Sequence, residues 1–192
     1  MTHIWWVRHG PTHEKAFVGW RDVPADLSDT TAIARTSDYL PDDALIGASD
    51  LIRASATANA IANGRRRLAD DPALREFDFG VWDGMTFDAV AKRDPIDSRL
   101  FWEDPGVRQA PKGESWDQVS ARVGGAVDKL VTHYPNQHLV LVAHIGVIMT
   151  QIQRASGSSA YAAMGHQIAN FSVTDMTFDG KDWAMGTINH IA

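Results

Sequence analysis

An uninterrupted apolar run over 139–143 (LVLVA) constrains the fold of this chain more than any other feature. A strand without polar residues on either face is typical of a parallel sheet that helices cover on both sides. Shorter runs of the same kind occupy 4–7 (IWWV) and 44–48 (ALIGA). These three segments predict neighbouring strands in the interior of an α/β protein.

Helical patterns accompany these runs. Apolar side chains recur at steps of three and four from Trp116 to Val131, which indicates an amphipathic helix, and Ser115 with Gln118 supplies a capping box at its start. Residues 51–67 are rich in alanine and predict a helix whose solvated C-terminal end carries the basic run 65–67 (RRR). Residues 147–154 predict a further helix.

The closing segments 171–178 and 183–188, around Asp179-Gly180, predict a hairpin or two adjacent strands. Alternating strands and helices imply an α/β fold, a three-layer α/β/α sandwich with a mostly parallel central sheet. The length of 192 residues predicts a single domain over 1–192. Around 77–112 the pattern loosens among aromatic residues and prolines, which predicts a lid or inserted subdomain. Its aromatic side chains are expected to form a small core, with Trp82 and Trp102 as candidates for substrate contact.

Composition limits the class of function. The absence of cysteine excludes disulfides, thiolate metal ligands and cysteine nucleophiles. A net charge of −6 without a dominant basic stripe argues against nucleic-acid binding. No apolar run reaches the roughly 18 residues that span a membrane, and the N-terminus lacks a signal-peptide layout, so we expect a soluble cytoplasmic protein. His3, His133, His138 and His190 are scattered without the spacing of metal ligands, so no metal is expected. No cofactor is expected either.

Cationic and imidazole side chains follow all three apolar runs. Arg8 and His9 come after the first, Arg53 shortly after the second, and His144 after the third. The carboxyl ends of parallel strands meet at one edge of a sheet, where open α/β sheets bind their ligands. Two guanidiniums and two imidazoles repel one another in an empty cleft, so the arrangement predicts an anion site. The planar arginine fork suits a phosphoryl group.

Five segments occur in an order that is found in one known family. They are 8–12 (RHGPT), 49–54 (SDLIRA), 74–84 (LREFDFGVWDG), 113–115 (GES) and 141–144 (LVAH). The chain resembles the histidine phosphatase superfamily, also called phosphoglycerate mutase-like, from Trp5 to about Gly146. The resemblance implies a metal-independent phosphatase that acts on a small phosphorylated metabolite through a phosphohistidine intermediate.

The resemblance also implies a role for each matching residue. His9 is the expected nucleophile, and Glu76 is the expected acid that protonates the leaving oxygen and then activates water. The phosphoryl oxygens are expected to be held by Arg8, Thr12, Arg53 and His144. To attack, His9 must be neutral, which neighbouring guanidiniums favour. To donate a proton, Glu76 must stay protonated, which desolvation by nearby aromatic side chains favours.

Some positions depart from the family pattern or have a second interpretation. Pro11 stands where glutamate is common, Lys15 near a common asparagine and Ile145 where glycine is common. Lys15 retains a donor for phosphate, and Ile145 is expected to narrow the pocket wall, beside which the next residue, Gly146, offers a backbone amide. Asp78 is the alternative to Glu76 as the acid, and His144 has a structural alternative as a helix cap.

Two other functions fit the same residues. A phosphoglycerate mutase would return the phosphoryl group to a bound acceptor, but the segment after His144 lacks the Gly-Asn-Ser pattern of that branch. A phospho-ligand binding protein with weak catalysis would keep the pocket, and Pro11, Lys15 and Ile145 leave this alternative open. The expected partner is a small phosphorylated substrate or inorganic phosphate. The sequence specifies neither the substrate nor the oligomeric state, for which a homodimer is the commonest arrangement.

Overall fold

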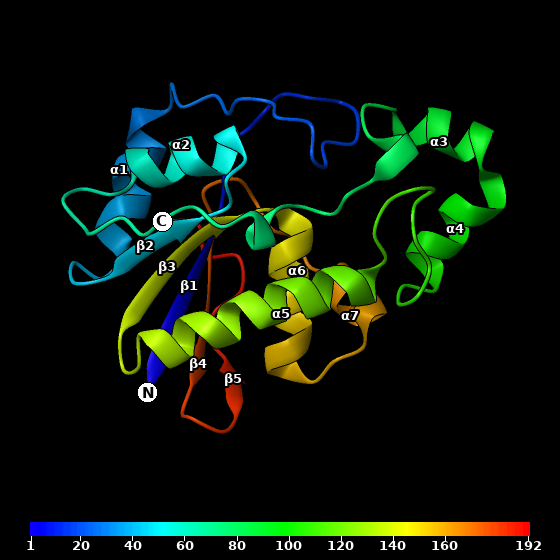
Figure 1. Cartoon of the computed structure of the whole chain (residues 1–192). Coiled ribbons are helices and arrows are strands. Elements are labelled where there is room, and N and C mark those ends of the chain that lie inside the picture. Colours follow the sequence, from blue (N-terminus) through cyan, green and yellow to red (C-terminus); the bar gives the residue numbers. More distant parts are fainter.

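The computed structural model describes residues 1–192, and its centre is a five-stranded sheet in the order β2-β3-β1-β4-β5 (Figure 1). The strands are β1 (Thr2–Arg8), β2 (Leu45–Ala48), β3 (His138–Ala143), β4 (Val173–Phe178) and β5 (Trp183–Met185). β3 runs parallel to β1 and β2, whereas β4 pairs antiparallel with β1 and β5. The predicted α/β class with a mostly parallel sheet is confirmed, and the closing segments do form adjacent strands.

Helices cover both faces of this sheet. They are α1 (Thr30–Tyr39), α2 (Ile52–Ala60), α3 (Phe87–Arg93), α4 (Pro95–Glu103), α5 (Trp116–His133), α6 (Ile145–Ser156) and α7 (Ala160–Met164). α5 begins at the predicted capping box, in which Ser115 Oγ accepts the Gln118 N–H and Gln118 Oε1 accepts the Ser115 N–H. None of the helices combines the length and the apolar character that a membrane crossing requires.

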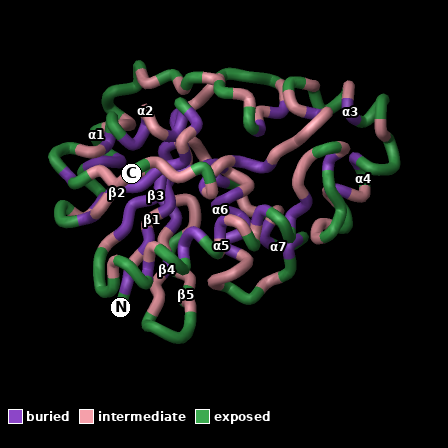
Figure 2. Tube along the Cα trace, viewed as in Figure 1, coloured by how far each residue is buried: buried purple, intermediate pink, exposed green.

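Apolar side chains of the inner strands alternate between the two faces. On one face, Ile4 and Trp6 belong to a core shared with α5 and α6, and on the other, Val7 belongs to a core shared with α2. Figure 2 shows buried positions concentrated along β1, β3 and α6. The sheet is therefore the middle layer between two layers of helices, as the continuous apolar runs predict.

The strand register brings the carboxyl ends of the three parallel strands level. Arg8 at the end of β1 pairs with Ala143 at the end of β3, and Ala48 at the end of β2 pairs with Val142. Residues that follow these strands therefore emerge at the same edge of the sheet. This register is the physical reason why side chains far apart in sequence can share one site.

The stretch around 77–112 contains α3 and α4, which stand to one side of the sheet in Figure 1. Phe77, Trp82 and Phe101 are buried here, and the Trp82 Nε1–H donates to Asp94 Oδ2 at 2.7 Å. These rings supply the apolar contacts that hold two short helices in place. Trp82 is therefore a core residue, whereas Trp102 near the end of α4 is only half-buried.

The helix predicted over 51–67 is shorter than expected, because α2 ends at Ala60. The prediction that the basic run is solvated was wrong for Arg65, which is 6% exposed. Its guanidinium donates to the carbonyl oxygens of Ser37 at 2.9 Å and Leu40 at 2.7 Å. These carbonyls lie at the C-terminal end of α1, where a helix cannot satisfy its own last acceptors. Arg65 thus fastens α1 to the segment that leaves α2.

Replacement of Arg65 by methionine should lower the free energy of unfolding by about 3 kcal/mol, because buried carbonyl oxygens lose their donors. The exposed neighbour Arg66 provides a matched control, and its replacement by methionine should change stability by less than about 0.5 kcal/mol. Urea unfolding of both variants measures the difference. Equal losses in the two variants would contradict the role of Arg65.

Candidate active site

His9 follows β1 directly and lies at the carboxyl edge of the sheet. Its backbone N–H donates to the Ala143 carbonyl oxygen at 3.1 Å, and its Nδ1 lies 2.7 Å from the Gly10 carbonyl oxygen. A carbonyl oxygen only accepts, so Nδ1 carries the proton and Nε2 keeps its lone pair. The side chain is 7% exposed and lines a cavity of about 620 Å³. His9 therefore has one free nitrogen that can attack.

Contacts from distant segments hold the turn that carries His9. The Gly10 N–H donates to Thr57 Oγ1 at 3.0 Å, and Asn170 Nδ2 donates to the His9 carbonyl oxygen at 2.7 Å. A Cβ at position 10 would lie 2.8 Å from the Phe171 ring, so this close approach requires glycine. Thr57 and Asn170 belong to no motif, and neither contact is recognisable from the sequence.

Two guanidiniums are fixed beside the imidazole by backbone carbonyls. Arg8 lines the cavity, and its Nη1 donates to the Ile168 carbonyl oxygen at 2.6 Å, while its buried Nε has no protein partner. Arg53, in the first turn of α2, is 1% exposed and donates to the carbonyl oxygens of Gly19 at 2.7 Å and Arg21 at 3.0 Å. Arg53 is not part of the cavity wall, and its charge acts on the site from behind that wall.

His144 lies between β3 and α6, and its ring centroid is 5.1 Å from that of His9. The side chain is fully buried, and both ring nitrogens lack a protein partner. It makes no capping hydrogen bond to α6, so the structural alternative of a helix cap is wrong. His144 is not part of the cavity wall, but buried polar groups are normally hydrogen-bonded, so its two unpartnered nitrogens beside His9 are suited to a ligand at this site.

Glu76 supplies a buried carboxyl group to the same cavity. The side chain is 4% exposed, its Oε1 accepts the Phe77 N–H at 2.9 Å, and its Oε2 accepts the Gly146 N–H at 3.2 Å. A Cβ on Gly146 would lie 2.5 Å from Oε1, so only glycine lets α6 approach the carboxyl. The alternative acid, Asp78, binds the Gly80 N–H at 2.8 Å and does not line the cavity.

Burial sets the protonation states of the site in the expected directions. It is the largest cause that raises the pKa of the Glu76 carboxyl, against the opposing effect of two backbone N–H groups. Burial first and the Arg53 charge second lower the pKa of His9 to about 3. Burial also lowers the pKa of His144 far below its usual range. The His9 imidazole is therefore neutral near neutral pH, and burial stabilises the protonated form of the Glu76 carboxyl relative to a solvated one.

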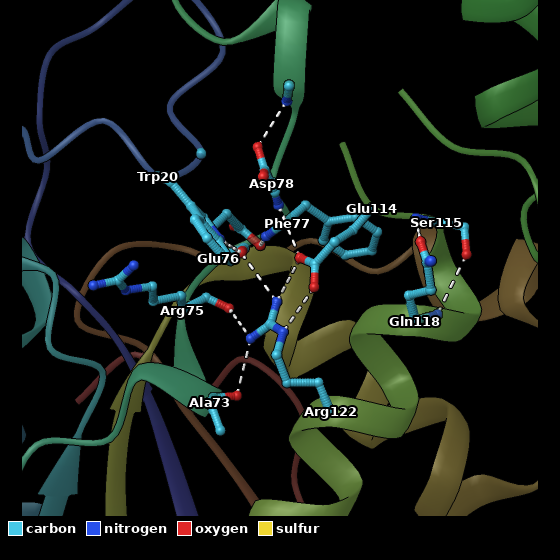
Figure 3. Close-up of polar contacts among 12 residues, drawn as sticks. Trp20, Ala73, Arg75, Glu76, Phe77, Asp78, Glu114, Ser115, Gln118 and Arg122 are labelled. Atoms are coloured by element: carbon cyan, nitrogen blue, oxygen red, sulfur yellow. Dashed lines mark hydrogen bonds and ion pairs between the residues drawn. The ribbon is translucent and has the colours of Figure 1, made fainter. Parts of the chain in front are cut away.

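Arg122 on α5 holds the segment that carries Glu76 (Figure 3). Its guanidinium donates to the carbonyl oxygens of Ala73 and Arg75, each at 2.9 Å, and of Glu76 at 3.2 Å. Glu114 binds the same guanidinium through both carboxylate oxygens, at 2.9 and 2.7 Å. This network fixes the backbone of the acid, although Arg122 itself belongs to none of the motifs recognised in the sequence.

These residues and their order along the chain match one known family. The family model described as histidine phosphatase superfamily (branch 1) matches residues 4–191. The chain belongs to the histidine phosphatase superfamily.

The chain is also similar to individual known proteins. The bifunctional protein Rv2228c of Mycobacterium tuberculosis is 31% identical over 166 residues, which cover 85% of this chain and 43% of that protein, so the chain spans less than half its length. The structure of YhfR from Bacillus stearothermophilus matches with a TM-score of 0.91 at 26% identity, over 100% of this chain and 98% of that one. The mycobacterial glucosyl-3-phosphoglycerate phosphatase Rv2419c matches with a TM-score of 0.86 at 26% identity, over 99% of each chain.

The departures from the superfamily pattern lie in different places. Pro11 and Lys15 are both outside the cavity wall, and Lys15 is exposed. Ile145 does belong to the wall. The Gly146 amide next to it binds Glu76 rather than pointing at an open pocket. Thr12, the expected hydroxyl donor, lines the cavity.

Proposed function

We propose that this chain is a metal-independent phosphatase that hydrolyses a small phosphorylated metabolite through a phosphohistidine at His9. One observation carries the proposal: a single cavity holds an imidazole with a free Nε2 and the buried carboxyl of Glu76. A nucleophile needs the lone pair and a general acid needs the proton. The orphaned nitrogens of Arg8 and His144 support the proposal, because phosphoryl oxygens would supply acceptors for them.

In the proposed first step, the Nε2 lone pair of His9 attacks phosphorus, and the bond from phosphorus to the leaving oxygen breaks. The leaving oxygen takes the proton of Glu76 and departs as the alcohol. The Nδ1–H bond to the Gly10 carbonyl oxygen stabilises the charge that the ring gains. Arg8 and Arg53 stabilise the negative charge on the transferring oxygens.

In the proposed second step, water attacks phosphorus and gives one proton to the Glu76 carboxylate. The bond between phosphorus and Nε2 breaks, and its electron pair returns to the His9 ring. Inorganic phosphate leaves, and both groups regain their starting protonation states. The sum is one ester and one water converted to one alcohol and one phosphate.

Phosphate release compared with phosphoglycerate interconversion tests the reaction type. Phosphorus NMR would follow the enzyme with a panel of phosphomonoesters and, separately, with phosphoglycerates. We expect inorganic phosphate from the esters and no isomer exchange between phosphoglycerates. Interconversion faster than release would instead indicate a mutase. Binding without either product would indicate a phospho-ligand binding protein.

Replacement of Arg122 by lysine should lower kcat about 10- to 100-fold, because lysine cannot hold three carbonyl oxygens and Glu114 together. KM should change little, since Arg122 does not line the cavity. The alkaline limb of the pH profile should shift in this variant because the Glu76 carboxyl is displaced. The exposed Arg35 on α1, replaced by lysine, is the control. An unchanged kcat and pH profile in the Arg122 variant would contradict the positioning role.

A further inference from the structure

The cavity is apolar away from its catalytic end. Of its 18 lining residues, 12 are hydrophobic. Its charged members are Arg8, Glu14 and Glu76, of which Arg8 and Glu76 belong to the proposed phosphoryl site. Glu14 is negative and pairs with Arg21 at 3.2 Å. The part of the wall that would receive the leaving group therefore has no cation.

Aromatic rings form much of that wall. The centroid of the Phe17 ring lies 4.3 Å from that of Phe87 and 4.8 Å from that of Phe79. The Phe17 ring is nearly parallel to that of Trp102, at a centroid distance of 6.0 Å. Phe17 comes from the segment after β1, Phe79 from the segment before α3, Phe87 from α3 and Trp102 from α4. Phe87 is 59% exposed, although it borders the cavity. A ligand that covers this ring would remove its apolar surface from water.

We propose that this cavity selects phosphomonoesters of apolar alcohols or phenols that carry no second anionic group, and that Phe87 and Trp102 set the preference. The inference rests on the proposed phosphatase function and names its substrate class. Apolar carbons of the alcohol would pack against the two rings. A carboxylate or second phosphate on the alcohol would lose its hydration without gaining a cation. The reaction is the same two-step hydrolysis, with the apolar alcohol as the leaving group.

A matched pair of substrates tests the preference. Hexyl phosphate and 6-phosphohexanoate share chain length and leaving-group chemistry and differ by a terminal carboxylate. We expect kcat/KM to be at least about 10-fold higher for hexyl phosphate, because the carboxylate would enter an apolar wall. Equal values, or a preference for 6-phosphohexanoate, would overturn the inference.

Variants of Phe87 and Trp102 test whether these two rings cause the preference for the apolar substrate. Phe87→Ala and Trp102→Ala should each lower kcat/KM for hexyl phosphate about 10-fold while leaving 6-phosphohexanoate within about threefold. Phe87→Lys should raise kcat/KM for 6-phosphohexanoate, because it adds the missing cation. Ile96→Ala on α4 is the control, since Ile96 is 66% exposed and outside the cavity wall. Equal losses for both substrates in the ring variants would overturn the assignment of these residues.

Binding to the His9→Ala variant separates the inference from the proposed function. Calorimetry should show tighter binding of hexyl phosphate than of 6-phosphohexanoate in the absence of turnover. If the wild-type protein hydrolyses neither ester but the variant keeps this binding order, the phosphatase function fails and the pocket preference stands. If the wild type hydrolyses both equally and the variant binds both equally, the preference fails and the phosphatase function stands.

Discussion

Replacement of His9 by alanine should reduce kcat for every phosphomonoester about 10⁴-fold or more, because the variant has no nucleophile for the covalent step. Arg8, Arg53 and His144 would remain in place, so the proposed phosphate site should persist. Inorganic phosphate should therefore bind the variant with an affinity within about 10-fold of the wild type. Steady-state kinetics and calorimetry measure the two quantities separately.

His13→Ala is the matched control for this prediction. His13 is exposed, pairs with Asp26 at 2.8 Å and does not line the cavity. Its replacement should leave kcat unchanged. Equal rates of hydrolysis in the His9 variant and the wild type would show that this ring is not the nucleophile, whatever the control does.

Replacement of Glu76 by glutamine should lower kcat about 10²- to 10⁴-fold for alkyl phosphates, whose leaving oxygen needs a proton. The loss should be smaller for 4-nitrophenyl phosphate, because its phenolate leaves without one. Glutamine preserves the size of the side chain, but its single amide oxygen can accept only one of the N–H groups of Phe77 and Gly146, and its NH2 group faces the other. We therefore expect a loss of stability of about 1 kcal/mol, which thermal unfolding measures separately from the loss of kcat.

The pH dependence of kcat/KM provides a second test of Glu76 as the general acid. The first step uses the protonated carboxyl, so kcat/KM should fall as pH rises through the pKa of Glu76, which burial raises. His9 attacks as the neutral ring, and its pKa of about 3 means that it imposes no acid limb above that pH. The alkaline limb should vanish in Glu76→Gln after correction for ionisation of the substrate. Its survival in Glu76→Gln, together with its loss in Asp78→Asn, would assign the acid to Asp78.

The fold and the convergence of the site could be predicted because they depend on local patterns. Residues 139–143 are fully buried on both faces of the sheet, and such burial leaves a continuous apolar run in the sequence. Parallel strands then bring the residues after them to one edge, so the proximity of His9 and His144 follows from topology. Because imidazoles and guanidiniums follow these strands, the sequence also predicts that the shared site binds an anion.

Long-range contacts explain what could not be predicted. The guanidiniums of Arg65 and Arg122 satisfy carbonyl oxygens of distant segments, and in sequence they look like ordinary surface cations. Helix propensity alone predicted a helix over 51–67, whereas α2 ends at Ala60. Likewise, Trp82 is a core residue and Trp102 lines the cavity, although both belong to the same aromatic stretch. Which rings face the cavity depends on how α3 and α4 pack, and this packing cannot be predicted from a local sequence pattern.

Trapping the covalent enzyme tests the central claim most directly. The enzyme would be mixed with an excess of aryl phosphate, quenched in alkali within the first turnovers, digested and examined by mass spectrometry. We expect a phosphoryl group on the peptide that contains His9, stable in alkali and lost in acid, and absent from His9→Ala. A phosphoryl group on another residue, or hydrolysis that inverts the configuration at phosphorus in a single displacement, would contradict it.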